Sequence, residues 1–412
     1  MSDTPSTTPL ARMGVRKDSL DRLFPYLLLA ITMAALVPVL EMGFFQPIEV
    51  GYESMSISIR DWGSFLDNWR GDPHGLLYYF VLRVPALFGH SKLAWRSTSI
   101  IPGMMGVYLL GLIAAKVCKS KAVALLAAAA YGFSATMRGI FIAVRTYPLG
   151  LFLVLAAFYC LVNFLAGNGR RARRLMWFGI LTSLAVATEF YAILFFLACV
   201  GALALLGAAR PLLRGRALEW TRRNWRVLIT AFGLPVAVFA CFYLSMRSLG
   251  DYSMTAIASL HLPNFCWSPG TSRMDFVLRN LRADMNYMLP IEMSSAGVAL
   301  GILAVFAPLL LYRVLCRKQS DEAPVSSLPG LVLLLLLAEL IVLSLLRLYP
   351  FGGEARHQSI LFPFFTLTAF LLLDKVIGFV PASGLLSWLR AGILAVAGAG
   401  ICLLYTSPSP RD

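Results

Sequence analysis

Titratable side chains gather between the first two long apolar runs of the sequence. Residues 46–94 contain Glu53, Asp72 and His74. A carboxylate or an imidazole held at one place can accept a proton during a reaction. The alternative is that these are ordinary solvated side chains of a loop. For Glu53 we favour the functional interpretation.

Basic side chains lie at the edges of later apolar runs. Arg356 and His357 follow Gly352-Gly353, and Arg145 precedes another run. The guanidinium group presents paired donors that match the oxygens of a phosphate, and glycines let backbone N–H groups approach an anion. These residues are therefore candidates for binding an anion. The alternative is that they only reach toward the membrane surface, as long basic side chains often do.

Two glutamates lie in or beside apolar runs. Glu189 is at the end of a run, where it can reach the same region as the residues above. Glu339 is in the middle of a run, where a charge is costly unless it is neutralised or paired. We expect Glu339 to be a protonated or hydrogen-bonded packing residue rather than part of a proton relay.

The elements that hold these residues must be membrane helices. The chain has 412 residues, of which 58% are hydrophobic and only 14% are charged. Soluble domains are nearer half apolar and a quarter charged. The net charge of +15 comes from short basic clusters between apolar runs, a distribution typical of membrane topology rather than of nucleic-acid binding. The composition predicts an all-α polytopic membrane protein.

Apolar segments of about 20 residues predict about 11 transmembrane helices. A tail at 1–22 precedes them, and the transmembrane domain covers 23–401. Residues 402–412 read CLLYTSPSPRD, which resembles a translated sequencing adapter, and we expect them to be an artefact. The predicted spans are 24–45, 95–115, 122–138, 147–167, 175–190, 191–209, 227–247, 291–315, 328–348, 359–380 and 387–401.

The distribution of basic residues predicts the orientation of these spans. Connections rich in Lys and Arg, such as the six arginines within 210–226, are expected in the cytoplasm together with the N-terminus. Two long segments, 46–94 and 248–290, then lie outside, and all four histidines are on the outer side because His357 is in the short outer loop 349–358. The second carries rings and arginines suited to a membrane surface. The chemistry is expected on the non-cytoplasmic face, which would be the periplasmic or external side of a bacterial inner membrane.

Several motifs resemble one known superfamily in their order. Tyr52-Glu53 follows the first span, Asp72-Pro-His74-Gly-Leu-Leu-Tyr-Tyr comes next, and Arg96 opens the second span. Arg145-Thr-Tyr147, Thr188-Glu189-Phe-Tyr and Arg356-His357 continue the series. This order resembles the GT-C superfamily of polyprenyl-phosphate-sugar-dependent glycosyltransferases, near the protein mannosyltransferase and aminoarabinose transferase branch. The likeness is clearest over the first 200 residues.

The resemblance implies a donor, an acceptor and a set of site residues. A polyprenyl-phosphate sugar would enter from the membrane lipid, and the acceptor would be an unidentified glycan, lipid or protein. Glu53, Asp72 and His74 would be catalytic, and Arg145, Tyr147, Glu189, Arg356 and His357 would bind substrate. Because Tyr52 replaces one acid of the family's pair, we expect no metal, although some relatives use a divalent ion.

Two other functions stay open at this point. A lipid-linked-sugar flippase or transporter is one, but the sequence shows no internal repeat of the kind that many transporters have. An inactive relative that binds lipid-linked sugar is the other, and Tyr52 favours it. We therefore expect a glycosyltransferase, with these two as rivals.

Overall fold

The computed structural model describes most of the helical chain. It describes residues 17–45, 63, 65, 74–87, 92–167, 171–208, 223–248, 265–288, 323–352, 355–379, 392 and 394–395. Within these ranges the secondary structure is helical, with no strand. Six of the helices are long and apolar enough to cross a membrane, or seven if one bent pair forms a single span. The protein is therefore an all-helical integral membrane protein, whereas the predicted count of about 11 spans is not confirmed.

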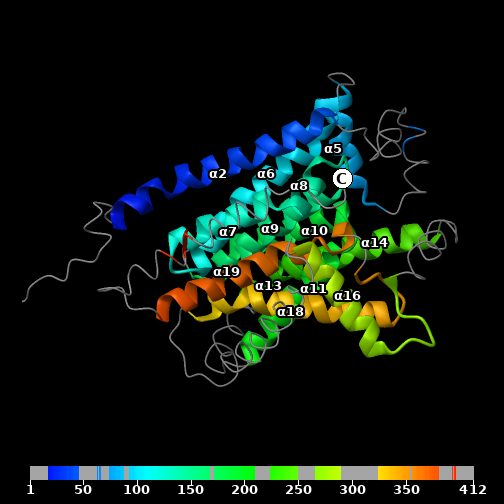
Figure 1. The fold of residues 1–412 in the computed structure, drawn as a ribbon. Coiled ribbons are helices and arrows are strands. Elements are labelled where there is room, and N and C mark those ends of the chain that lie inside the picture. Colours follow the sequence, from blue (N-terminus) through cyan, green and yellow to red (C-terminus); the bar gives the residue numbers. More distant parts are fainter. Residues whose placement is uncertain are drawn as a thin grey trace, which may run out of the picture.

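The long helices fall on predicted spans and run side by side (Figure 1). The predicted segments 291–315 and 387–401 lie wholly or almost wholly outside the described residues. The described helices on predicted spans are α2 (Lys17–Phe45), α6 (Lys92–Val117), α7 (Lys121–Phe133), α8 (Ala135–Ile142), α9 (Tyr147–Leu165), α10 (Arg171–Thr188), α11 (Ala192–Ala208), α13 (Trp225–Leu228), the π-helix η1 (Ile229–Gly233), α14 (Leu234–Ser248), α18 (Ala323–Leu345) and α19 (Leu361–Phe379).

One predicted span is bent. The segment 122–138 was expected to be a single helix, but α7 and α8 meet at 56°. Ser134 between them has an extended backbone, with φ −54° and ψ 128°, and its Oγ accepts a hydrogen bond from Met137 N at 3.5 Å. Serine is a preferred residue at the start of a helix because its side chain caps an unpaired N–H group. The bend therefore follows from a cap inside an otherwise apolar run.

The bundle is packed around α9, most of which is buried. The ring of Phe158 on α9 meets Phe364 on α19 edge to face, with centroids 5.0 Å apart, and Phe364 also stacks near Phe195 on α11. Aromatic pairs in these arrangements add to the free energy of burial. At one end of the bundle, Asp374 of α19 accepts hydrogen bonds from Lys119 N and Ser120 N, which fixes the α6–α7 turn.

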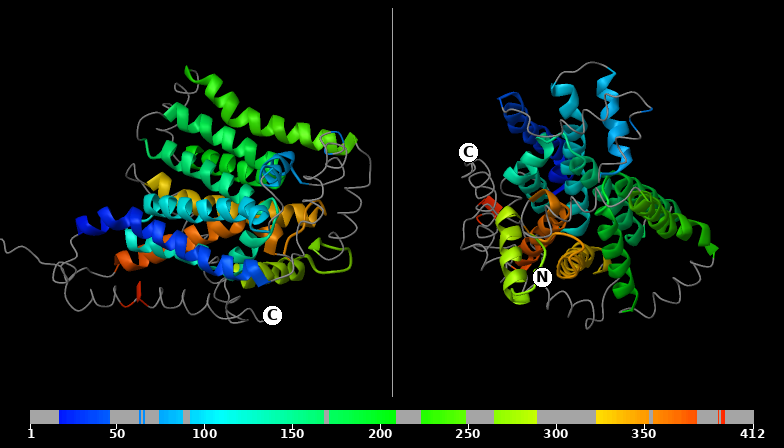
Figure 2. Two further views of the ribbon diagram at one scale, coloured as in Figure 1. Left: turned by 90° about the horizontal axis from the view of Figure 1, so that it is seen from above. Right: turned by 90° about the vertical axis from the view of Figure 1, so that its right-hand side faces the viewer.

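Two shorter helices lie at the other end of the bundle. They are α5 (Leu76–Ala86) and α16 (Arg273–Met288). Figure 2 shows α5 nearly end-on in the view where the long helices are seen from the side, so α5 crosses the bundle direction. The 3-10 helix η2 (Ala355–Gln358) precedes α19 at this same end and packs against α16. Most of the predicted site residues are found here.

Candidate functional site

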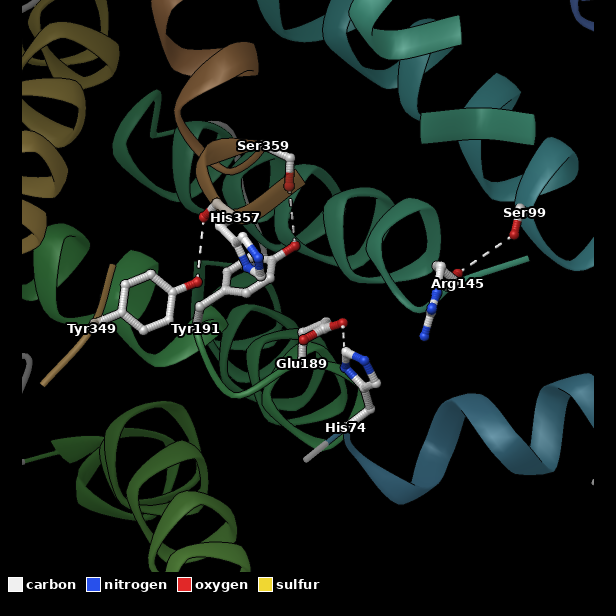
Figure 3. Close-up of polar contacts among 8 residues, drawn as sticks. All are labelled: His74, Ser99, Arg145, Glu189, Tyr191, Tyr349, His357 and Ser359. Carbon is white, nitrogen blue, oxygen red and sulfur yellow. Dashed lines mark hydrogen bonds and ion pairs between the residues drawn. The ribbon is translucent and has the colours of Figure 1, made fainter. Parts of the chain in front are cut away.

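The start of α5 is held against the end of α10. Gly75 N donates a hydrogen bond to Thr188 O at 3.1 Å, and a Cβ at position 75 would overlap the Ala187 carbonyl group. Only glycine fits such a close approach of two backbones. The contact places the neighbouring His74 beside Glu189, with 3.2 Å between His74 Nδ1 and Glu189 Oε1 (Figure 3).

Two stacked tyrosines extend this contact into the bundle. The ring of Tyr147, the first residue of α9, packs edge-on to His74, with centroids 6.1 Å apart. Its other neighbour is Tyr191, whose ring is nearly parallel at 6.3 Å. Tyr191 Oη then lies 3.4 Å from Ser359 Oγ, just before α19. Contacts therefore connect α5, the α10–α11 turn, α9 and the segment before α19.

The helix η2 is fastened by the segment that precedes it. Tyr349 Oη donates to His357 O at 3.3 Å, and Gln358 Nε2 donates to Pro350 O at 3.0 Å. Ser359 N in turn bonds to Arg356 O at 3.4 Å. The predicted anion-binding residues Arg356 and His357 are therefore on a turn that contacts Tyr349 directly and Tyr191 through Ser359.

Arg145 lies in the turn between α8 and α9. Its carbonyl oxygen accepts a hydrogen bond from Ser99 Oγ of α6 at 3.4 Å. Figure 3 shows the guanidinium group directed away from Ser99 and toward the side where α5 lies. Since Tyr147 follows two residues later and packs on His74, Arg145 is at the same end of the bundle as the other predicted residues.

Burial keeps the tyrosines of this region protonated. It raises the pKa of Tyr191 well above its usual value, and the carboxylate of Glu189 raises it further. Burial also raises the pKa of Tyr349, with smaller contributions from Tyr147 and Glu189. Because a charge on any of these rings would be unfavourable, they act as O–H donors and ring surfaces near neutral pH.

The structure brings together part of the predicted site. His74, Tyr147 and Glu189 are in direct contact, and the backbone of η2 carries Arg356 and His357 next to them. Glu53 and Asp72 lie outside the described residues. Among the described residues, no three His, Cys, Asp or Glu side chains are grouped as metal ligands would be.

Sequence reasoning did not select three residues of this region. Tyr191, Tyr349 and Ser359 supply contacts that were not among the predicted site residues. Tyr191 comes two positions after Glu189, at the same end of an apolar run, and this spacing was a usable signal. Tyr349 and Ser359 flank the predicted Arg356-His357 pair, and only the fold shows that they join it to Tyr191.

Comparison with known proteins rests on structure. No family model and no curated protein matches the sequence. The crystal structure of ArnT from Cupriavidus metallidurans bound to undecaprenyl phosphate is similar, with a TM-score of 0.50 and 14% identity, over 92% of this chain and 75% of ArnT.

The oligosaccharyltransferase AglB from Archaeoglobus fulgidus is also similar, both in its apo form and in complex with an inhibitory peptide and a dolichol-phosphate. Each comparison gives a TM-score of 0.50 and 13% identity, over 93% of this chain and 56% of AglB. This chain thus spans little more than half the length of that enzyme. Identities this low establish only a likeness of fold, which is shared with ArnT and AglB.

Proposed function

We propose that this protein transfers a sugar from a polyprenyl-phosphate donor to an acceptor on the non-cytoplasmic face of the membrane. The observation that carries the proposal is the convergence of His74, Glu189 and the η2 turn at one end of a membrane-spanning bundle. The fold supports it, because ArnT was solved with undecaprenyl phosphate and AglB with a dolichol-phosphate. A bacterial inner membrane with the N-terminus in the cytoplasm belongs to the same proposal.

The donor phosphate is assigned to the basic residues at this end. Arg356 and His357 lie on η2, at the edge of the spanning helix α19, and Arg145 lies at the edge of α9. A lipid phosphate sits at the membrane surface, where helix ends meet it. The planar guanidinium binds two phosphate oxygens at once, which also suits the leaving group as its charge develops.

The reaction needs one proton acceptor. The acceptor hydroxyl attacks the anomeric carbon and gives its proton to a carboxylate, while the bond from that carbon to the phosphate oxygen breaks. Polyprenyl phosphate leaves with the bonding electrons. We assign the carboxylate to Glu53, with Asp72 as the substitute; both are outside the described residues.

Glu189 acts in this scheme as a positioning residue. Its carboxylate contacts His74 Nδ1 at 3.2 Å and is almost fully buried, with 5% of the residue exposed. A carboxylate on one ring nitrogen fixes the orientation and the tautomer of an imidazole. The ring of Tyr147 also packs edge to face against the imidazole. The imidazole is thereby held ready to contact donor or acceptor.

Reconstituted protein tests the proposal. Purified wild type in vesicles is mixed with radiolabelled polyprenyl-phosphate sugars and an envelope extract, beside the Glu53→Gln and Arg356→Ala variants. Arg226→Ala on α13 is the matched control, because Arg226 is exposed outside the site. Transfer should fall at least tenfold in the first two variants and stay unchanged in the control. Unchanged transfer in both site variants refutes the assignment, and lipid translocation without transfer favours a flippase.

Metal dependence is tested in the same vesicles. We propose that transfer needs no divalent ion, because Tyr52 takes one of the two acid positions of the family motif. Dialysis against EDTA should leave the transfer rate unchanged. A loss that Mg²⁺ or Mn²⁺ restores would show that a metal takes part.

A further inference from the structure

The helix α16 presents three different faces. Its buried face carries Phe276, Asn280 and Asp284, spaced four residues apart. An apolar flank exposes large side chains, with Met274 66% and Leu278 44% exposed. The charged side chains Asp275, Arg279 and Arg282 are exposed on the remaining flank.

The burial of Asn280 and Asp284 and the exposure of Met274 and Leu278 are unlike the pattern of a helix on a soluble protein. There the apolar side chains would be buried and the polar ones exposed. A helix in the membrane surface can direct its apolar flank to lipid and its charges to water. Buried polar groups of membrane proteins usually face the interior of the bundle or a hydrated cavity. The buried side chains of Asn280 and Asp284 are therefore expected to face the interior of the bundle at this end.

Two contacts fix where that polar face lies. Asn280 packs on Gly352, whose φ of +77° and lack of side chain let the two residues approach. One helical turn beyond Asp284, Tyr287 O accepts a hydrogen bond from Thr136 Oγ1 of α8 at 2.8 Å. Asp284 lies between these two contacts along α16 and is buried, as Asn280 is.

Polar atoms at this contact lack partners within the described residues. Both carboxylate oxygens of Asp284 and Nδ2 of Asn280 are buried without a hydrogen bond there, and so is Oε1 of Gln358 on η2. Asp284 is 1% exposed and Asn280 5%. Buried polar atoms are nearly always satisfied in folded proteins, by water or a ligand if not by protein.

We propose that Asn280 and Asp284 bind the hydroxyl groups of the donor's sugar. The inference rests on the proposed function and adds to it the residues that recognise the sugar. Carboxyl and carboxamide groups one turn apart supply both donors and acceptors, as neighbouring hydroxyls require. Gly352 and Arg356 belong to one short segment, so the sugar face adjoins the turn assigned to the phosphate.

The chemistry of this face suits a neutral sugar rather than the phosphate. Burial alone raises the pKa of Asp284 well above its usual value, and no cation among the described residues counters this. A group in such surroundings is held uncharged and can donate as well as accept. A phosphate placed there would be desolvated without a cation to balance it.

Comparing lipid phosphates with and without a sugar distinguishes recognition of the sugar from recognition of the phosphate. The probes are undecaprenyl phosphate and the same lipid phosphate bearing glucose, mannose, galactose or arabinose, and the dissociation constant of each is measured with full-length protein in detergent. Wild type should bind at least one sugar-bearing lipid about tenfold more tightly than the bare lipid, a difference of about 1.4 kcal/mol.

The variants identify which residue gives that preference. Asp284→Leu should abolish it while leaving the dissociation constant for bare undecaprenyl phosphate within twofold of wild type. Asp284→Asn, which keeps the shape and the hydrogen bonds, should retain most of it. Asp275→Leu, on the exposed side of the same helix, is the matched control and should bind as wild type does.

The possible outcomes distinguish this inference from the proposed function. If wild type does not bind undecaprenyl phosphate, the proposed function fails. If the bare lipid binds but no sugar increases its affinity, or if Asp284→Leu weakens both lipids equally or neither, only the inference is overturned. Arg356→Ala, in contrast, should weaken both lipids to the same extent.

Discussion

Replacement of Gly75 by alanine tests whether the approach of α5 to α10 builds the site. The new Cβ would overlap the Ala187 carbonyl oxygen and lie 2.5 Å from its carbon and 2.8 Å from the carbonyl carbon of Thr188. Carbon atoms rest about 3.5 Å or more apart, so the start of α5 must retreat by about 1 Å. These neighbours are backbone atoms at the end of a packed helix and cannot turn aside.

The retreat has two costs. Crowding a packed position costs about 1–3 kcal/mol, and the hydrogen bond from Gly75 N to Thr188 O, now 3.1 Å, contributes about 1 kcal/mol. The sum is about 2–4 kcal/mol of local stability. His74 moves with the backbone, and a misplacement of about 1 Å can cost about 100-fold in rate.

The measurements are the sugar-transfer rate in vesicles and the thermal unfolding midpoint in detergent. Gly139→Ala on α8 is the control, because a Cβ there meets nothing within 4 Å. We expect a loss near 100-fold for Gly75→Ala and none for Gly139→Ala. Equal rates in the two variants would refute the close approach of α5 to α10 and the role assigned to His74.

Three further predictions concern single side chains at this end of the bundle. Glu189→Gln should lower transfer about 10–100-fold, since it weakens the contact that orients the imidazole, whereas Glu339→Gln on α18 should not. Gly352→Ala should cost about 1–3 kcal/mol of stability, measured by thermal unfolding against Gly378→Ala, because φ is +77° and Asn280 fills the space. Asp284 holds its proton more tightly in the folded state than in the unfolded state, so the free energy of unfolding should fall as pH rises above about 4. Asp284→Asn should lack that part of the decline, and identical pH profiles of unfolding would contradict the buried carboxyl.

Composition and apolar run lengths were sufficient to predict the class of fold. Helices such as α6 and α9 follow directly from uninterrupted apolar segments, because a segment in lipid must satisfy its backbone hydrogen bonds internally. The bend at Ser134 was not predicted, since the run is apolar on both sides and only the serine marks it. A local cap there outweighs the hydropathy of the segment.

The site was predictable in its residue types but not in its contacts. His74 and Glu189 were chosen separately, one as a catalytic neighbour and one as a substrate contact. Their pairing depends on Gly75, where a side chain would overlap the Ala187 carbonyl group and displace the N–H group that donates to Thr188 O. The glycine is therefore what permits the observed contact between His74 and Glu189.

The polar face of α16 shows what periodicity can still reveal in a segment between apolar runs. The region 248–290 was described by its rings and arginines, whereas Asn280 and Asp284 follow Phe276 at helical spacing. The apolar flank of α16 can face lipid and its charged flank can face water. Its third face is polar and buried, so it needs polar surroundings within the protein. That third face predicts a ligand-facing surface, because neither lipid nor a packed apolar core would favour burying a carboxyl group there.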